Sequence, residues 1–429
     1  DISVDECICE EYEKWIKENH FDEGNGWGSV PWSQKEMPLS EEFICEAEKR
    51  NDAAIVIIGR TAGEDQDNRA DEGSYYLTQT ERELIKNVTE TFEKSVVLLN
   101  VGNIIDMKWV DEYKPSAVMY VWQGGQEGGN GVLDVLDGTV SPSGKLTDTI
   151  AYNIEDYPSA SYFGDADKNY YVEDIYVGYK YFQTAAADKV MYPFGFGMSY
   201  TDFEISGSVK NVDENSVVVD TAVKNTGDCE GKEVVQIYIE APQGKLGKPA
   251  RELKAFAKTK ELAPGEKQKM TLHIPVKNLA SYDDSGVAGH KSCYVSEAGA
   301  YVFHVGNSVR NTKIADVDGK GAYIVKELCV TEALQEALAP TEAFERIRPG
   351  QSREDGSYQQ EKEAVPQQTI RLQERIEAHL PEQLAITGDK GIRFSDVAEG
   401  KADLDTFIAQ LTKEELATVS YTHLTLPTT

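Results

Sequence analysis

Five carboxylates cluster in one short stretch of the chain, directly after an apolar run typical of a buried strand. A carboxyl group that is crowded by others and partly desolvated has a raised pKa, so it can act as a general acid near neutral pH. The alternative is a solvated acidic loop without a chemical role, and these features alone favour that alternative. The cluster lies in GRTAGEDQDNRADEGSYYLT at residues 59–78 and consists of Glu64, Asp65, Asp67, Asp71 and Glu72.

Two further stretches could in principle hold a metal ion or a phosphate, and both lack the residues that this chemistry needs. In DQDNRADEG, Ala70 stands where an EF-hand turn requires glycine, and the terminal glutamate is missing. The glycine-rich stretch GGQEGGNG at 124–131 contains Glu127, and no Lys-Ser or Lys-Thr pair follows it. We therefore expect no metal and no cofactor, and explain these glycines by close packing of a helix on a sheet.

Aromatic side chains are the next candidates, because their faces stack on the C–H faces of sugars. All five tryptophans precede residue 123, and Trp27 and Trp32 lie in the loop-like GWGSVPWSQ. Most tryptophans are core residues, so these two are secondary substrate-binding candidates. The six histidines are scattered, and neither GxSxG nor HExxH occurs.

The elements that position the acidic stretch are predicted from hydrophobic periodicity. Residues 53–58, 95–101 and 116–121 are short apolar runs that predict buried strands. Between the first two, apolar residues at helical spacing predict a helix, with a capping box formed by Thr80 and Glu83. This alternation predicts a parallel sheet with helices on its faces, and the crevice at the carboxyl ends of such strands binds ligands.

The pattern changes near residue 203, where apolar and polar residues alternate at period two and turn signals separate the runs. Regularly spaced short strands predict a β-sandwich. Residues 330–370 are rich in Glu, Gln, Ala and Pro and are typical of a linker with some helix. The last residues, VSYTHLTLPTT, resemble a translated sequencing-library adapter.

Composition limits the partners. The chain has 429 residues, enough for two to three domains, and a formal net charge of −31. Such a surface repels phosphate backbones and anionic lipids, and no apolar run is long enough to span a bilayer, so we expect neither nucleic acid nor a membrane as partner. The six cysteines lack CxxC spacing and indicate free thiols, hence a cytoplasmic location. The chain starts with Asp1 rather than Met, so the absence of a signal peptide decides nothing about secretion.

Several blocks, in this order, resemble glycoside hydrolase family 3. IVIIGRTAGEDQDN, VVLLNVGNIIDMKWVDEY, WQGGQEGGNGVLDVLDGTVSPSGKLTDT and YPFGFGMSYTDF are similar to its C-terminal α/β sandwich. NTGDCEGKEVVQIYIEAPQGKLGKPARELKAFAKTKELAPGE is similar to its fibronectin type III-like domain, and DVAEGKADLDTFIAQLTKEELA to the opening of its (β/α)8 barrel. The barrel would follow the sandwich, as in inverted-order β-glucosidases.

The resemblance implies a mostly parallel α/β sandwich, an all-β fibronectin type III-like sandwich and a partly helical tail. The expected boundaries are 1–202 for an N-terminally truncated α/β domain, 203–325 for the β-sandwich, 326–385 for a linker, 386–418 for a truncated barrel start and 419–429 for an artefactual tail.

The resemblance also implies retaining hydrolysis of terminal, non-reducing β-D-glucosyl residues by two carboxylates. The family's acid/base pattern, a Gly-Glu pair just after a strand, matches Gly63 and Glu64, so Glu64 is the expected general acid/base. The nucleophile belongs to the barrel and is not expected in this chain, which would be inactive alone. Arg60 and Asp67, beside Glu64, join Trp27 and Trp32 as candidates for substrate binding.

Two alternatives stay open. One is a non-catalytic carbohydrate-binding or adhesive module, in which the β-domain binds and the α/β part is a scaffold. The other keeps the fold and changes the sugar, for example to a β-xyloside. The expected partner is in each case a β-linked oligosaccharide or glycoside, with homo-oligomerisation open.

Overall fold

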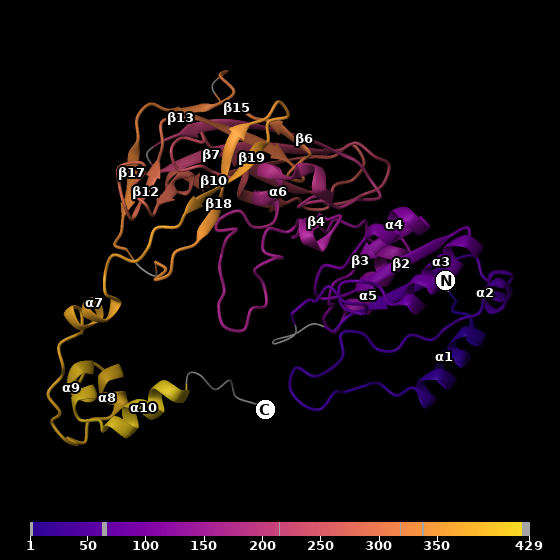
Figure 1. The fold of residues 1–429 in the computed structure, drawn as a ribbon, viewed down its shortest axis with the longest axis horizontal. Coiled ribbons are helices and arrows are strands. Elements are labelled where there is room, and N and C mark those ends of the chain that lie inside the picture. The colour runs from indigo at the N-terminus through magenta and orange to yellow at the C-terminus, as the bar shows by residue number, and fades with distance from the viewer. Residues whose placement is uncertain (1–2, 62–66, 214, 318, 337–338, 423–429) are drawn as a thin grey trace. The chain divides into compact units, whose positions relative to one another are not determined.

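The computed structural model describes residues 3–61, 67–213, 215–317, 319–336 and 339–422, and it divides into two compact units. The first, Asp1–Gln367, contains an α/β part and a β-rich part, and the second, Gln368–Thr429, is helical (Figure 1). No helix in the described ranges combines the length and apolarity needed to cross a bilayer.

The α/β part is built on a parallel sheet of three strands in the order β1-β2-β3, which confirms the predicted strands to within one residue at most ends. Helices alternate with these strands, as the periodicity predicted. The elements are α1 (Glu6–Glu18), α2 (Glu41–Glu48), β1 (Ala54–Gly59), α3 (Gln79–Thr91), β2 (Ser95–Asn100), α4 (Lys108–Tyr113), β3 (Ala117–Tyr120) and α5 (Gly128–Leu136).

The capping box of α3 lies two residues earlier than predicted. The Thr78 side chain accepts from the Glu81 N–H, and the Glu81 carboxylate accepts from the Thr78 N–H, so Thr78 rather than Thr80 is the N-cap. Both pairs satisfy the same Thr-x-x-Glu pattern. The structure uses the earlier pair because Glu81 is also the partner of a buried arginine, described below.

One face of the sheet carries the core of the α/β part. Val56, Ile58, Val97 and Leu99 pack there against apolar side chains of α2, α3 and α4. On β1 the alternate side chains point the other way, and Ile55 and Ile57 are 47% and 59% exposed. The apolar run that predicted a strand buried on both faces is therefore covered on one face only within the described residues.

The glycine-rich stretch 124–131 leads into α5, as predicted, but close packing on the sheet does not explain its glycines. A Cβ on Gly125, Gly128, Gly129 or Gly131 would meet nothing within 4 Å. Only Gly124 is crowded, by Gly128 Cα at 2.7 Å, inside the same turn. The prediction of close helix–sheet approach is therefore wrong for these positions.

The β-rich part begins with two packed sheets, which confirms the predicted β-sandwich. Their strand orders are β10-β7-β6-β15 and β14-β13-β8-β9, and the core between them is rich in Val, Ile and aromatic residues. The sandwich strands are β6 (Phe203–Val212), β7 (Ser216–Asn225), β8 (Val234–Glu240), β9 (Glu252–Lys258), β10 (Lys267–Pro275), β13 (Gly299–Gly306), β14 (Thr312–Ile314), β15 (Asp316–Val317) and β16 (Tyr323–Val325).

The segment predicted as a linker with some helix contains strands instead. β18 (Glu345–Ser352) and β19 (Tyr358–Ala364) form an antiparallel hairpin, and β17 (Cys329–Ala333) joins β12 (Cys293–Ser296) and β11 (Ser281–Asp283) in a third sheet. The prediction failed because these strands are charged: Arg346 and Arg348 both bond Glu363 across the hairpin. Cross-strand ion pairs stabilise a hairpin whose composition resembles that of a linker.

Short elements connect the two parts of the first unit. They are β4 (Ile150–Ala151), the 3-10 turns Ile154–Asp156 and Ala187–Lys189, α6 (Tyr179–Ala185) and β5 (Val190–Tyr192). The following YPFGFG touches the sandwich: Val309 N–H donates to the Phe194 carbonyl, and Phe194 stacks on Tyr179 with ring centroids 4.5 Å apart. Phe194 is half-buried and Phe196 is exposed.

The second unit is helical in its described part. Its helices are α7 (Leu372–Ala378), α8 (Phe394–Ala398), α9 (Leu404–Ala409) and α10 (Lys413–Thr422). Gln410 links the stretch before α8 to α9, because its side-chain carbonyl accepts from the N–H groups of Lys390 and Ile392.

Candidate active site

Three loops meet at the carboxyl edge of the parallel sheet. The register pairs Gly59 with Asn100 and Leu99 with Tyr120, so the loops after β1, β2 and β3 leave the sheet on the same side. The acidic stretch is the first of these loops. Its place is the ligand-binding edge that the sequence predicted for this class of sheet.

Glu64, the expected acid/base, lies outside the described residues, because the structure does not describe 62–66. The residues on either side of this gap are described, and they make defined contacts of their own. The role of Glu64 therefore stays a prediction. The described geometry that bears on it is that of two flanking residues, Arg60 and Asn68, which we call the anchors.

Arg60 is the first anchor. Its side chain is buried and makes a two-pronged ion pair with Glu81, with N–O distances of 2.6 and 2.8 Å. Its remaining N–H groups donate to the backbone carbonyls of residues 59, 74 and 76. Because the guanidinium is engaged by these internal acceptors, the geometry favours a positioning residue over the substrate contact that we predicted.

Asn68 is the second anchor, on the far side of the gap. Its side-chain N–H donates to the Ile104 carbonyl at 2.7 Å, and its side-chain oxygen accepts from the Ser74 hydroxyl at 2.9 Å. Ser74 in turn accepts from the Arg69 N–H. The loop after β1 is thereby tied to the loop after β2, next to the sheet edge.

The secondary candidates lie in different surroundings. The Thr61 N–H donates to the Trp32 carbonyl at 2.7 Å, so half-buried Trp32 lies beside the start of the acidic loop. Trp27 is 79% exposed. Asp67 is exposed at the end of the gap. The structure thus brings Trp32 and Asp67 to the loop and does not join Trp27 to it by any described contact.

Trp122 was not singled out from the sequence, and its backbone is strained. It lies two residues after the end of β3, at the same sheet edge, and its φ is 59°, a region that bulky residues rarely adopt. Its ring packs on that of Tyr120 at 4.4 Å, and the Tyr120 hydroxyl bridges Asn103 O and Ile105 N. Such outliers cluster at functional sites. A tryptophan between a predicted strand and two glycines was the available signal.

Near this edge, the carboxyl group of Asp106 has a raised pKa. Asp106 follows β2 and lines a cavity of about 330 Å³ together with Tyr76, Arg82 and Trp109. Burial raises the pKa of Asp106, against the effect of Lys108, whose Nζ lies 3.7 Å from Oδ1. In the part of the chain that the structure describes, no group of three His, Cys, Asp or Glu residues is arranged to hold a metal ion.

Two domain families match the chain. Residues 39–200 match the glycosyl hydrolase family 3 C-terminal domain, and residues 233–309 match a fibronectin type III-like domain. These matches confirm the resemblance inferred from the sequence motifs.

Named relatives match nearly all of the chain. A beta-glucosidase of Ruminococcus albus is 49% identical over 413 residues, which are 96% of this chain and 42% of that protein. Beta-glucosidase A of Butyrivibrio fibrisolvens is 34% identical over 98% of this chain and 56% of its own length. The chain thus spans about half the length of the curated relatives it matches.

Solved structures give the same result. A beta-glucosidase from Paenibacillus barengoltzii superposes with a TM-score of 0.93 at 54% identity, over 97% of this chain and 46% of that one. Beta-glucosidase 3B from Thermotoga neapolitana, solved in complex with glucose, superposes with a TM-score of 0.68 at 38% identity, over 77% of this chain and 46% of that one.

Proposed function

Because the chain belongs to glycosyl hydrolase family 3, whose C-terminal domain it carries, we propose that it forms part of a retaining β-glucosidase. The observation that carries this proposal is the 49% and 54% identity to beta-glucosidases over nearly the whole chain. The substrate is then a β-glucoside or a β-linked oligosaccharide with a terminal, non-reducing glucosyl residue.

In this proposal Glu64 is the general acid/base. It protonates the departing glycosidic oxygen, and then takes a proton from the water that attacks the glycosyl-enzyme. The Arg60–Glu81 pair and the Asn68 contacts support this role, since they fix both flanks of the loop. In the same proposal, Trp32 and Asp67 contact the sugar or its aglycone; the contact of Trp32 with Thr61 and the exposure of Asp67 support this role.

The nucleophile in this proposal is a carboxylate of the barrel domain and is not among residues 1–429. Residues 386–418 are then the beginning of that barrel. The chain alone should accordingly show no turnover.

The test is a chimaera in which residues 1–418 replace the matching 42% of the Ruminococcus albus relative. We expect it to hydrolyse an aryl β-glucoside, and Glu64→Ala to reduce deglycosylation by about 10²–10⁴-fold. Azide should restore turnover in Glu64→Ala and yield the glycosyl azide, because a small anion replaces the missing base. Glu90→Ala, an exposed glutamate on α3, is the matched control and should retain activity.

Full activity in Glu64→Ala would contradict the acid/base assignment. An active chimaera that prefers aryl β-xylosides would keep the reaction and change the sugar. A chimaera that binds oligosaccharides without hydrolysing any glycoside would favour the carbohydrate-binding module.

A further inference from the structure

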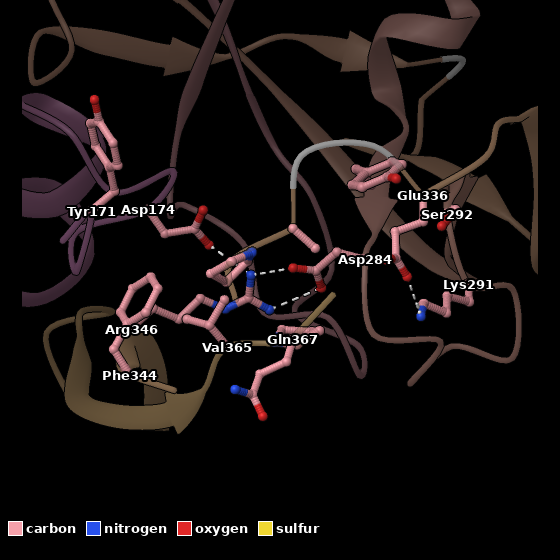
Figure 2. A pocket seen from close by; sticks show the side chains of 14 residues that line it. Tyr171, Asp174, Asp284, Lys291, Ser292, Glu336, Phe344, Arg346, Val365 and Gln367 are labelled. Atoms are coloured by element: carbon pink, nitrogen blue, oxygen red, sulfur yellow. Dashed lines mark hydrogen bonds and ion pairs between the residues drawn. The ribbon is translucent and has the colours of Figure 1, made fainter. Parts of the chain in front are cut away.

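A pocket of about 350 Å³ lies in the β-rich part of the first unit, and none of its lining residues belongs to the acidic loop. Its volume falls within the range of small-molecule sites, about 300–1,000 Å³. Four parts of the chain line it (Figure 2). They are residues 171 and 174 before α6, residues from β11 and the loop that leads to β12, residues 336, 339 and 340 after β17, and β18 with the residues on either side of its hairpin.

Arg346 of β18 is at the centre of the pocket's polar wall. Asp284 accepts from its two terminal nitrogens at 2.5 and 3.0 Å, and Asp174 lies 3.2 Å from one of them. Figure 2 shows the two carboxylates approaching the guanidinium from different sides. Each carboxylate has about four acceptor positions, so both keep lone pairs for hydroxyl groups of a ligand.

The polar wall is held rigidly. Asp283, which is fully buried, accepts from four backbone N–H groups of residues 286–290 and so fixes the loop that presents Asp284. Asp174 and Ser292 both line the pocket with positive φ, 48° and 62°. A wall that is ordered without ligand loses little conformational entropy on binding.

Aromatic rings form the other walls. Tyr171 is 70% exposed and Tyr282 is 37% exposed, and Phe344 contacts Tyr170 with ring centroids 5.3 Å apart and ring planes tilted by 59°. Exposed rings beside carboxylates provide both kinds of contact that a sugar offers: C–H faces for stacking and hydroxyl groups for hydrogen bonds.

We infer that this pocket binds a neutral sugar, which stacks on Tyr171 and Tyr282 and donates hydroxyl hydrogen bonds to Asp174 and Asp284. An anionic ligand fits poorly, since Arg346 is already neutralised by carboxylates and acidic lining residues outnumber basic ones. That the sugar is a β-glucoside rests on the proposed function. That the pocket binds a neutral sugar rests on the lining residues alone.

In the experiment, the 429-residue chain is titrated with cellobiose, and binding is measured by saturation-transfer NMR and by calorimetry. Tyr171→Ala should weaken binding at least about fivefold, as loss of an aromatic anchor does. Asp284→Asn should weaken it as well, because one acceptor becomes a donor. Tyr152→Ala, a 39% exposed tyrosine outside the pocket, is the matched control and should bind as the unchanged chain does.

Asp284→Asn could perturb folding through Arg346, so Tyr171→Ala, whose ring is largely exposed, decides the result. Absence of cellobiose binding, or equal binding by Tyr171→Ala, would overturn the inference, as would tighter binding of glucose 6-phosphate than of glucose. Glu64→Gln separates the two proposals: it should abolish turnover in the chimaera and leave cellobiose binding by the chain unchanged.

Discussion

Arg60 and Glu81 form a buried ion pair at the end of β1, with 3% and 5% of their side chains exposed. Glu81→Ala would leave the guanidinium buried without its counter-charge, so we expect the free energy of unfolding to fall by about 3–5 kcal/mol. Loss of the capping box adds about 1 kcal/mol. Urea denaturation followed by tryptophan fluorescence measures the change. Exposed Glu83→Ala, on the same helix, should change it by less than about 0.5 kcal/mol, and equal losses in the two variants would refute this account.

Asp106 gives a prediction with a pH signature. Burial raises its pKa in the folded state above the ordinary 3.8, so above the raised pKa the folded chain holds a disfavoured carboxylate. The folded state binds its proton more tightly than the unfolded state, and stability falls as pH rises through the folded pKa. Asp106→Asn, which keeps an acceptor oxygen, should therefore melt higher than the unchanged chain at pH 7. The difference should vanish toward pH 3.8. A constant difference across this range would contradict the prediction.

At the residue scale the sequence singled out one loop for the chemistry, which stays a prediction, but it did not indicate the contacts of the residues that flank Glu64. Glu64 was chosen through a family pattern, and the local features alone favoured a solvated loop. The partner of Arg60 is 21 positions away and the partner of Asn68 is 36 positions away. Such pairs follow from the packing of α3 and the loop after β2, and no local spacing contains them.

At the scale of elements, the predictions that the structure confirms are those that rested on strong hydrophobic periodicity. The strands β1, β2 and β3 were predicted, and so was a β-sandwich after residue 203, because the apolar patterns there are strong. The hairpin β18–β19 was not, since its strands are joined by charged pairs and its composition is polar. Periodicity also did not indicate that the side chains on one face of β1 are exposed.

That open face leads to a prediction about self-association. Ile55 and Ile57 are exposed on an edge strand, an arrangement that favours pairing with another chain. Ile57→Thr should reduce association in sedimentation velocity and leave the melting temperature nearly unchanged, because a β-branched polar residue suits a solvated strand face. Ile58→Thr, one position on and 1% exposed, is the control and should lower stability by about 1–3 kcal/mol. Unchanged association in Ile57→Thr would show that this face is not responsible.

At the scale of the whole first unit, two contacts join its α/β and β-rich parts. In the first contact, the stretch YPFGFGMSY touches the sandwich through Phe194. A second contact, the largely buried ion pair of Lys145 and Glu233 at 3.0 Å, joins residues 88 positions apart and had no local signal. Each part has its own core, so their junction is the place where cooperativity can be tested.

Gly195 is the position that probes this junction. It has φ of 81°, and a Cβ there would lie 2.8 Å from Gln236 Oε1 and from Ser308 Cα. Gly195→Ala should strain the backbone and push the two parts of the unit apart, with a loss of about 1–2 kcal/mol and a fall in melting temperature of about 2–4 °C for each kcal/mol lost. Calorimetry should then show the α/β and β-rich parts melting in separate steps, because their coupling is weakened while their cores are intact. Gly131→Ala is the matched control: it lies in helix α5, has open space around its Cβ and should leave stability unchanged or raise it by about 0.5–1 kcal/mol. If Gly195→Ala melted in one step at the unchanged temperature, the docking of this turn on Gln236 and Ser308 would not be what couples the two parts.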